Sequence, residues 1–415
     1  MLQVAGIVAF ALTIFVSVCL HEAGHMLTAK AFGMKVTEYF AGFGPKLWSF
    51  RRGETEYGLK GIPLGGYVKI VGMTPHDEDV APEDEHRAMW RRPVWQRTIV
   101  LVAGSATHMI LAVVGIWLMA MTYGMPNPAL PKGNLSQPAV VKVEACAVVD
   151  ENRHGCLASD PSSPAAAAGF ETGDRITAVN GTPISTWEDA VKTIQALPAG
   201  TAAKISVDRA GAPLVMIVRP AAVQRAELKD DGSEGAVRPA SAIGISGVAT
   251  IPANVTYGPV DAVGVTVDRT GDLFTGTFTA LKKFPEKVPK LWTAITGGER
   301  DPDTPVSVVG VSRLGGEAVE HGLWSMFWGL FIGFNFFVGI FNLLPLLPLD
   351  GGHLAVIWFE KVRSWIYRLF KRPDPGRVNY MKLMPLTYAV ILVFGAITLL
   401  TVGADIVNPV TLFPR

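Results

Sequence analysis

The stretch VAGIVAFALTIFVSVCLHEAGHMLTAKAF, residues 4–32, decides the fold. It is long and apolar enough to cross a bilayer, whose hydrocarbon core needs about 20 helical residues, yet it contains His21, Glu22 and His25. It has no basic segment in front of it and no small-residue cleavage site, so it does not resemble a signal peptide. The sequence therefore predicts a retained membrane-spanning helix that carries His21, Glu22 and His25.

Three further apolar runs, residues 98–123, 323–347 and 383–407, also have the length of a membrane span. The composition agrees with this, because 49% of the residues are hydrophobic and only 18% are charged. The formal net charge of +1 provides no field that would favour a nucleic-acid partner. We expect a polytopic α-helical membrane protein with four transmembrane helices, in contact with the lipid bilayer and not with nucleic acid.

The distribution of Lys and Arg predicts how these spans are oriented. Basic residues gather between the third and fourth runs, at Lys361, Arg363, Arg368, Lys371, Arg372, Arg377 and Lys382. The positive-inside rule places this segment in the cytoplasm, and the basic loop after the first span agrees, although the acidic run 77–85 shares that loop. Both termini and the long insert between the second and third runs then face outward from the plasma membrane. The pair His21 and His25 lies toward the cytoplasmic side.

The residues His21-Glu22-Ala23-Gly24-His25 form an H-E-x-x-H pattern. Residues i and i+4 of a helix share one face, so the two imidazoles can bind one Zn²⁺ while Glu22 takes a proton from water. Ionisable side chains inside a span are costly without a partner, and a metal explains all three together. The alternative is a polar helix end at the water interface.

A third zinc ligand is expected, because catalytic zinc usually has three protein ligands and one open position. The run GIFNLLPLLPLDGGH, residues 339–353, offers Asp350 at a point where two prolines and two glycines interrupt the third span. An aspartate at such a break can equally close a helix end or form a turn. From the spacing alone, both interpretations of Asp350 stay open.

The H-E-x-x-H segment, taken with the N-x-x-P-x-x-P-L-D-G-G segment of residues 342–352, resembles the site-2 proteases, specifically the RseP-like bacterial group. The resemblance extends to GFGP at residues 42–45 and to GIPLGGYVK at residues 61–69. It implies that Asp350 is the third zinc ligand. It also implies an intramembrane zinc metalloprotease of regulated proteolysis, which cleaves single-span membrane proteins such as anti-sigma-factor regulators after an extracytoplasmic protease has trimmed them.

One position departs from that family's pattern. The second helix of such proteins commonly carries an A-G-P-x-x-N-like segment, whereas residues 103–108 read AGSATH, without the proline and the asparagine. His108 can donate a hydrogen bond to substrate or to a developing oxyanion, or act as a further base near the metal. It can also be a packing residue between helices.

Residues 36–71 have strand-like spacing, with turn signals at Arg52-Gly53 and at Leu64-Gly65-Gly66. This predicts a β-hairpin element on the cytoplasmic side. The hairpin either receives an extended substrate as an added strand, with Gly65 and Gly66 as contacts, or only caps the cavity.

Three residues near the end of the third span have two possible roles. Exposed backbone in a membrane is tolerated where it lines a cavity, so these residues can border the substrate, or they can simply end the helix. They are Asn342, Pro345 and Pro348.

The insert contains SPAAAAGFETGDRITAVNG at residues 163–181, a helix signal at 187–197 and strand signals over 203–218, which together resemble a single PDZ domain of α+β type. Such a domain either gates the protease by size or recruits substrate by strand addition. Cys146 and Cys156 either form a disulfide there, as an oxidising compartment permits, or remain free thiols.

The expected division of the chain is a first span (1–34), a β-element and loop (35–97), a second span (98–124), a PDZ domain (125–252), an amphipathic connector (253–322), a third span with the Asp350 motif (323–353), a basic segment (354–382) and a fourth span (383–415). Two other functions compete with the protease. A metal transporter needs ligands repeated along a path, and a catalytically inactive PDZ scaffold has no use for Glu22. The protease is favoured over both.

Overall fold

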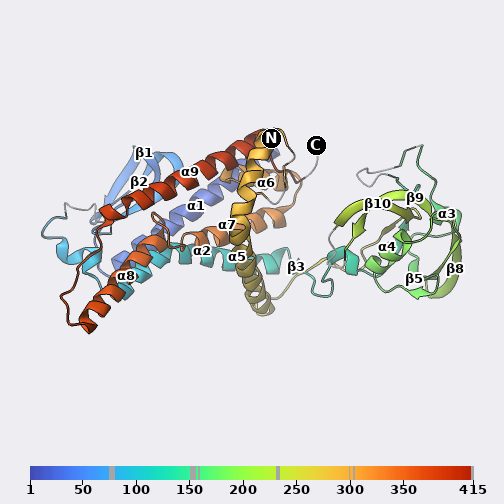
Figure 1. The fold of residues 1–415 in the computed structure, drawn as a ribbon, viewed down its shortest axis with the longest axis horizontal. Helices are drawn as coiled ribbons and strands as arrows, with labels where there is room; N and C mark the ends of the chain where they lie inside the picture. Colours follow the sequence, from blue (N-terminus) through green and yellow to red (C-terminus); the bar gives the residue numbers. More distant parts are fainter. Residues whose placement is uncertain are drawn as a thin grey trace. The chain divides into compact units, whose positions relative to one another are not determined.

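The computed structural model describes residues 1–73, 80–149, 156–157, 159–229, 234–298, 300–301 and 304–412. Residues 77–79 of the acidic run therefore lie outside the described residues. The chain divides into two compact units (Figure 1). We call Met1–Met121 with Gly258–Arg415 the membrane unit, and Thr122–Tyr257 the insert unit.

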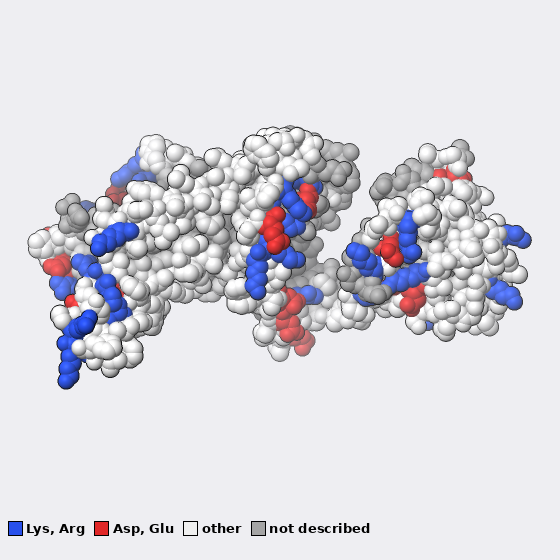
Figure 2. All heavy atoms as spheres, in the orientation of Figure 1, with Lys and Arg blue, Asp and Glu red and all other residues white. Residues whose placement is uncertain are grey.

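Within the described ranges, four helices are long and apolar enough to span a bilayer: α1 (Leu2–Ala31), α2 (Val94–Thr122), α7 (Trp324–Phe341) and α9 (Met384–Val407). The four predicted spans are thereby confirmed as helices. Figure 2 shows a broad surface without charged side chains over α1 and α9, and Lys and Arg side chains around the end of α8 (Asp350–Leu369). A multi-pass membrane protein has this distribution, because charge is excluded from the hydrocarbon layer.

The third span ends earlier than the predicted run to residue 347. Helix α7 stops at Phe341, and the next helix, α8, begins at Asp350. The reason is chemical: Pro345 and Pro348 have no backbone N–H to donate, and each disfavours the helical conformation of the residue before it.

Two helices occupy the predicted connector between the insert and the third span. Helix α5 (Asp261–Ile295) covers the predicted amphipathic stretch, and α6 (Val308–Glu320) was not foreseen. Helix α6 approaches α1 closely where glycines of the two helices meet. A Cβ on Gly6 of α1 would lie 2.9 Å from Cα of Gly316, and one on Gly316 would lie 2.7 Å from the carbonyl oxygen of Gln3. This packing places α6 beside the first half of α1.

The predicted hairpin is confirmed as strands β1 (Val36–Arg52) and β2 (Thr55–Ile70), with its turn at Gly53, whose φ is 65°. The second predicted turn is wrong, because Leu64-Gly65-Gly66 belongs to β2. Residues 38–41 pair with residues 66–69 on one side and with residues 56–59 on the other. Residues 66–69, which we call the outer row, therefore form an edge of the sheet, and no other described strand pairs with them.

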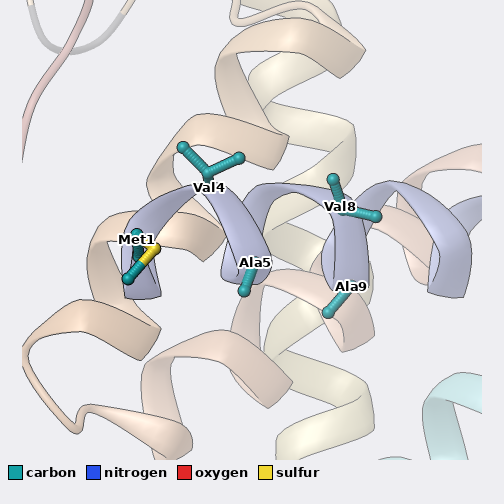
Figure 3. Close-up of a pocket in the computed structure, with 5 residues that line it drawn as sticks. All are labelled: Met1, Val4, Ala5, Val8 and Ala9. Carbon is teal, nitrogen blue, oxygen red and sulfur yellow. The ribbon is translucent and has the colours of Figure 1, made fainter.

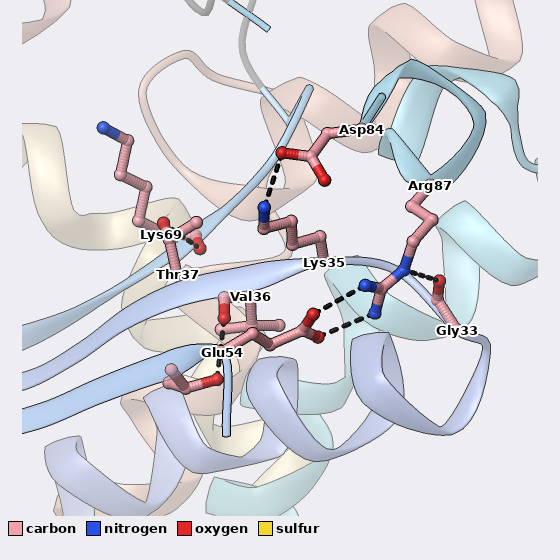
Figure 4. Close-up of polar contacts among 9 residues, drawn as sticks. Gly33, Lys35, Val36, Thr37, Glu54, Lys69, Asp84 and Arg87 are labelled. Carbon is pink, nitrogen blue, oxygen red and sulfur yellow. Dashed lines mark hydrogen bonds and ion pairs between the residues drawn. The ribbon is translucent and has the colours of Figure 1, made fainter. Parts of the chain in front are cut away.

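The loop between β2 and α2 fastens this sheet to the end of α1 (Figure 4). It contains the short 3₁₀ helices η1 (Glu85–Arg87) and η2 (Met89–Arg91). Arg87 donates two hydrogen bonds of 2.6 and 2.7 Å to the carboxylate of Glu54, next to the hairpin turn. Its Nε also donates to the carbonyl oxygen of Gly33, directly after α1. The sheet is thus held in a fixed position relative to α1.

The insert unit contains a four-stranded sheet in the order β6-β5-β7-β8, formed by β5 (Arg175–Val179), β6 (Thr182–Pro183), β7 (Ala203–Arg209) and β8 (Ala212–Val218). Three separate strand pairs also belong to the described part of the insert unit: β3 (Met125–Pro126) with β12 (Asn254–Val255), β4 (Val141–Val143) with β11 (Ile245–Gly247), and β9 (Ala221–Leu228) with β10 (Glu234–Ala242). The helices are η3 (Gly133–Ser136), α3 (Pro164–Ala167) and α4 (Trp187–Gln195). Cys146 and Cys156 form a disulfide, which decides the alternative left open by the sequence.

Candidate metal centre

Three side chains that are far apart in the sequence meet at one point of the membrane unit. His21 and His25 project from one face of α1, and Asp350 is the first residue of α8. The Nε2 atoms of the two histidines lie 3.1 Å apart, and each lies 3.3 Å from Oδ2 of Asp350. Among the described residues, these three form the group whose ligand atoms all lie within 4.8 Å of one another. The structure therefore brings together the three predicted ligands.

This triangle has the dimensions of a tetrahedral metal site. Ligand atoms that lie about 2.0–2.1 Å from a tetrahedral zinc ion are about 3.3 Å from one another. Space for the ion exists because α2 presents Gly104 here: a Cβ on Gly104 would lie 2.5 Å from Nε2 of His21 and would overlap Nε2 of His25. The donor set of two imidazoles and one carboxylate is one that zinc accepts. The residues present fit a zinc ion.

The contacts around the two histidines favour metal binding by Nε2. The Nδ1–H of His25 donates a hydrogen bond of 2.6 Å to the carbonyl oxygen of Val100 on α2. A carbonyl can only accept, so this bond leaves the lone pair on Nε2 free for a metal. Both rings are buried, with exposed fractions of 6% for His21 and 2% for His25. Nδ1 of His21 makes no hydrogen bond with the described residues.

The break between α7 and α8 positions Asp350. The carbonyl oxygen of Asn342 accepts a hydrogen bond of 2.8 Å from the backbone N–H of Gly351. A Cβ on Gly351 would overlap the carbonyl oxygens of Leu343 and Leu344, and one on Gly352 would lie 2.5 Å from the backbone nitrogen of Leu347. Only glycine therefore allows residues 342–349 to fold this tightly against the first turn of α8. The glycines of the predicted motif fix the place of the carboxylate.

A family model described as peptidase family M50 matches residues 9–372 of the chain. This chain belongs to peptidase family M50. It is 41% identical to the zinc metalloprotease Rip1 of Mycobacterium tuberculosis over 415 residues, which cover 100% of both chains. It is 44% identical to the zinc metalloprotease Rip1 of Mycolicibacterium smegmatis over 98% of both chains, and 30% identical to a putative zinc metalloprotease of Brucella suis over 88% of both.

Membership of family M50, the site-2 proteases, makes this chain a zinc metalloprotease and identifies its metal as zinc. The resemblance stated from the sequence motifs is thereby confirmed, and so is the predicted cofactor. A metal transporter and an inactive scaffold are set aside, because the full-length relatives are zinc metalloproteases.

In this M50 protease, Glu22 lies between α1 and the outer row of the sheet. The backbone of Val68 lies near the Glu22 carboxylate. A Cβ on Gly66 would lie 3.4 Å from Cγ of Glu22, so the strand passes the side chain in van der Waals contact. Of the two predicted contact glycines, Gly66 is thus beside Glu22, whereas Gly65 lies against the ring of Phe43.

His108 lies next to the three candidate ligands. Its ring centroid is 5.0 Å from that of His21, and its exposed fraction is 1%. Its Nδ1 is 2.8 Å from Oδ1 of Asn335, a fully buried residue of α7. Sequence reasoning missed Asn335, although an amide inside an apolar span is itself a signal that a polar partner is near.

The remaining sequence candidates are less close to the centre. Asn342 contributes its backbone carbonyl to the turn described above, and Pro345 and Pro348 are exposed. An open apolar groove of about 750 Å³, lined by Met1, Val4, Ala5, Val8 and Ala9, lies on the first turns of α1 (Figure 3). At 1.5 Å per helical residue, Ala9 is about 18 Å from His21, so this groove is separate from the metal centre.

Proposed function

We propose that His21, His25 and Asp350 hold the zinc ion, that Glu22 is the general base, and that the enzyme cleaves single-span membrane proteins within or near their transmembrane segment. The observation that carries this proposal is the position of the candidate ligands. His21 and His25 are buried in α1, a helix of bilayer-spanning length, and Asp350 joins them from the break after another span. A site built from spans acts on a peptide that is itself in the membrane.

Zinc, when bound here, supplies a Lewis acid that polarises the scissile carbonyl and activates water. The protein side chains do the rest. Glu22 takes the proton of the attacking water and later delivers it to the leaving amine, so no acyl-enzyme is required. Val100 holds the His25 ring in the tautomer that presents Nε2 to the metal. Water reaches the site from the cytoplasmic side, because His21 and His25 lie in the last third of α1, whose end the basic loop follows.

The substrate helix has to be unwound, because a helical backbone hides its carbonyls in hydrogen bonds. The outer row supports a way to achieve this. It is an edge of the sheet, and Gly66 and Val68 within it border Glu22. A peptide that added to this edge as a strand would be extended and would pass directly in front of the catalytic side chains. We therefore favour strand addition over a hairpin that only caps the cavity.

Disulfide crosslinking tests the strand. Cys146 and Cys156 are already paired, so the Cys19→Ser variant leaves no free cysteine. In that background, with Glu22→Gln to retain the substrate, Lys69→Cys is combined with single cysteines along a single-span substrate. Strand addition predicts crosslinks at alternate substrate positions. The control is Glu56→Cys, which lies on the other side of residues 38–41 from the outer row. Crosslinks at every third or fourth substrate position, or stronger crosslinks to Glu56→Cys, would show that the substrate does not pair with the outer row.

The proposal includes a topology in which both termini and the insert unit are extracytoplasmic, and a natural substrate of the anti-sigma-factor type that another protease has already trimmed. We further propose that the insert unit is a PDZ domain that gates by size. In support, the indole of Trp187 fills the space beside Gly247 at the end of β11, where a Cβ would lie 2.9 Å from the ring. A peptide that entered beside this strand would have to displace the indole.

Excision of the insert unit separates gating from recruitment. The backbone N–H of Asn127 donates to the carbonyl oxygen of Ala253, so these two points are adjacent and a short Gly-Ser linker can replace residues 128–252. A gate predicts that the shortened enzyme cleaves untrimmed substrates that the full chain spares. A recruiting domain predicts slower cleavage of trimmed and untrimmed substrates alike.

A further inference from the structure

His108 and Asn335 form a buried polar pair between α2 and α7, beside the candidate ligands but outside their set. Nδ1 of His108 is 2.8 Å from Oδ1 of Asn335, and Nδ2 of Asn335 donates a hydrogen bond of 2.9 Å to the carbonyl oxygen of Phe331. The exposed fractions are 1% for His108 and 0% for Asn335. A buried polar pair of this kind has a definite hydrogen-bond direction, because each group must be satisfied.

The carbonyl of Phe331 fixes that direction. It has no proton to give, so the part of the amide that faces it must be the NH₂ group, and the amide oxygen must face His108. An amide oxygen can only accept. Nδ1 of His108 therefore carries a hydrogen, and in the neutral imidazole Nε2 is an acceptor with a free lone pair. A doubly protonated ring would place a buried positive charge beside a site for a divalent cation, which is strongly unfavourable.

The His108 ring borders the candidate metal centre. His108 is one helical turn after Gly104 on the same face of α2, and Gly104 packs against Nε2 of His21. The His108 ring lies 5.0 Å from the His21 ring. It does not belong to the group whose ligand atoms all lie within 4.8 Å of one another. His108 is thus placed to accept a hydrogen bond rather than to bind the metal.

We propose that Nε2 of His108 accepts a hydrogen bond from a backbone N–H of the bound peptide, and that Asn335 is the positioning residue that makes this possible. The proposal rests on the strand addition proposed above. A strand paired with the outer row turns alternate N–H groups away from the sheet, and such groups need acceptors in a site without bulk water. From the sequence, His108 is a candidate hydrogen-bond donor to an oxyanion, whereas here it is an acceptor. A neutral ring with its hydrogen on Nδ1 has no hydrogen on Nε2 to donate.

The tautomer can be measured without any cleavage. The ring nitrogens of His108 are followed by ¹⁵N NMR in the zinc-loaded, detergent-solubilised full chain labelled with ¹⁵N-histidine, and the signals are assigned by their loss in His108→Ala. We expect an unprotonated Nε2 in the wild type and in Asn335→Asp, whose carboxylate still accepts from Nδ1. Asn335→Leu should give a mixture of tautomers. A proton on Nε2 in the wild type would overturn the proposal.

Kinetics on a single-span substrate test the peptide contact. Loss of one buried hydrogen bond corresponds to about a 10- to 100-fold fall in kcat/KM. We expect that fall in His108→Leu and in Asn335→Leu, with unchanged zinc content, and near wild-type kcat/KM in Asn335→Asp. In the His108→Leu background, Asn335→Leu should cause no further loss. The proposal would be contradicted if the losses of the two Leu variants added fully in the double variant, or if Asn335→Asp did not keep kcat/KM near the wild-type value. A wild type that cleaves no membrane substrate would instead refute the proposed function and leave the tautomer result standing.

Discussion

Gly104 on α2 packs so closely against His21 on α1 that a β-carbon at position 104 would lie 2.5 Å from Nε2 of the histidine. The same β-carbon would occupy the space between the two imidazoles. The absence of a side chain on α2 is therefore as much a part of the candidate metal centre as the candidate ligands on α1, and it gives the first prediction.

Gly104→Ala should lower zinc occupancy and protease activity together, because the added methyl group takes the place of the ion. Alanine is otherwise favourable in a helix, by roughly 1 kcal/mol relative to glycine, so the variant should fold. Zinc content by inductively coupled plasma mass spectrometry checks this. Gly395→Ala in α9 is the matched control, because a Cβ at that position would meet no described atom within 4 Å. Equal zinc content in both variants would show that the ion lies elsewhere.

Asp350→Asn should reduce zinc affinity by at least about tenfold and reduce activity with it, because an amide is a poorer zinc ligand than a carboxylate. Titration with a zinc chelator measures the affinity. Asp374→Asn is the control in the same part of the chain, since Asp374 is bonded to Ser364 and Gly376 instead. If only activity falls and zinc stays bound, Asp350 is not a ligand.

The Arg87–Glu54 pair should make the attachment of the hairpin dependent on pH. The hydrogen bond from Arg87 lowers the pKa of Glu54 below its ordinary value of 4.5. The stabilisation is therefore fully present above pH 4.5 and is lost as the pH falls through the lowered folded-state pKa. It amounts to less than about 1 kcal/mol, because the pair is partly exposed.

Hydrogen exchange of residues 50–56 at a series of pH values measures this effect. Exchange in the wild type should accelerate toward low pH relative to the intrinsic rate, whereas Glu54→Gln should exchange at the faster relative rate throughout. The same pH dependence in both proteins would mean that another group controls the hairpin.

Asp405 and Arg300 should contribute strongly to stability. Their 2.8 Å ion pair has side-chain exposed fractions of 1% and 4%, and Asp405 also accepts from the backbone N–H of Ser307 before α6. Asp405→Asn should cost on the order of 3–5 kcal/mol, because it leaves a buried guanidinium without its counter-charge. Thermal unfolding in detergent provides the measurement. Asp272→Asn removes an exposed pair with Arg269 and should change the midpoint little; a similar small change for Asp405→Asn would refute the prediction.

The sequence was sufficient to predict an element or a site residue where the signal lies within one short segment. Residues 4–32 are predominantly apolar, so α1 could be predicted from its length and composition, and the shared face of its two histidines from the period of a helix. Asp350 needed the motif resemblance, because its approach to His21 depends on how residues 342–349 fold beneath α8. Helix α6 escaped notice because it is short and rich in glycine, and glycine reads as a helix breaker unless the neighbouring backbone is known.

The hairpin shows the same limit. Leu64-Gly65-Gly66 has the composition of a turn, yet it belongs to β2, and only the pairing of residues 38–41 on both sides reveals which row is the edge. The role of Asn335 can be recognised only from its contact with His108 on another helix. Apart from α6, what the sequence could not predict was mainly the contacts between elements.

We propose above that a zinc site within the spans hydrolyses membrane-embedded peptides with Glu22 as base. The most direct measurement combines zinc content with cleavage of a single-span substrate by the Glu22→Gln variant in liposomes. We expect wild-type zinc content and a loss of cleavage of about 10²- to 10⁴-fold, the usual contribution of a general base. Cleavage at the wild-type rate by a zinc-loaded Glu22→Gln variant would contradict it.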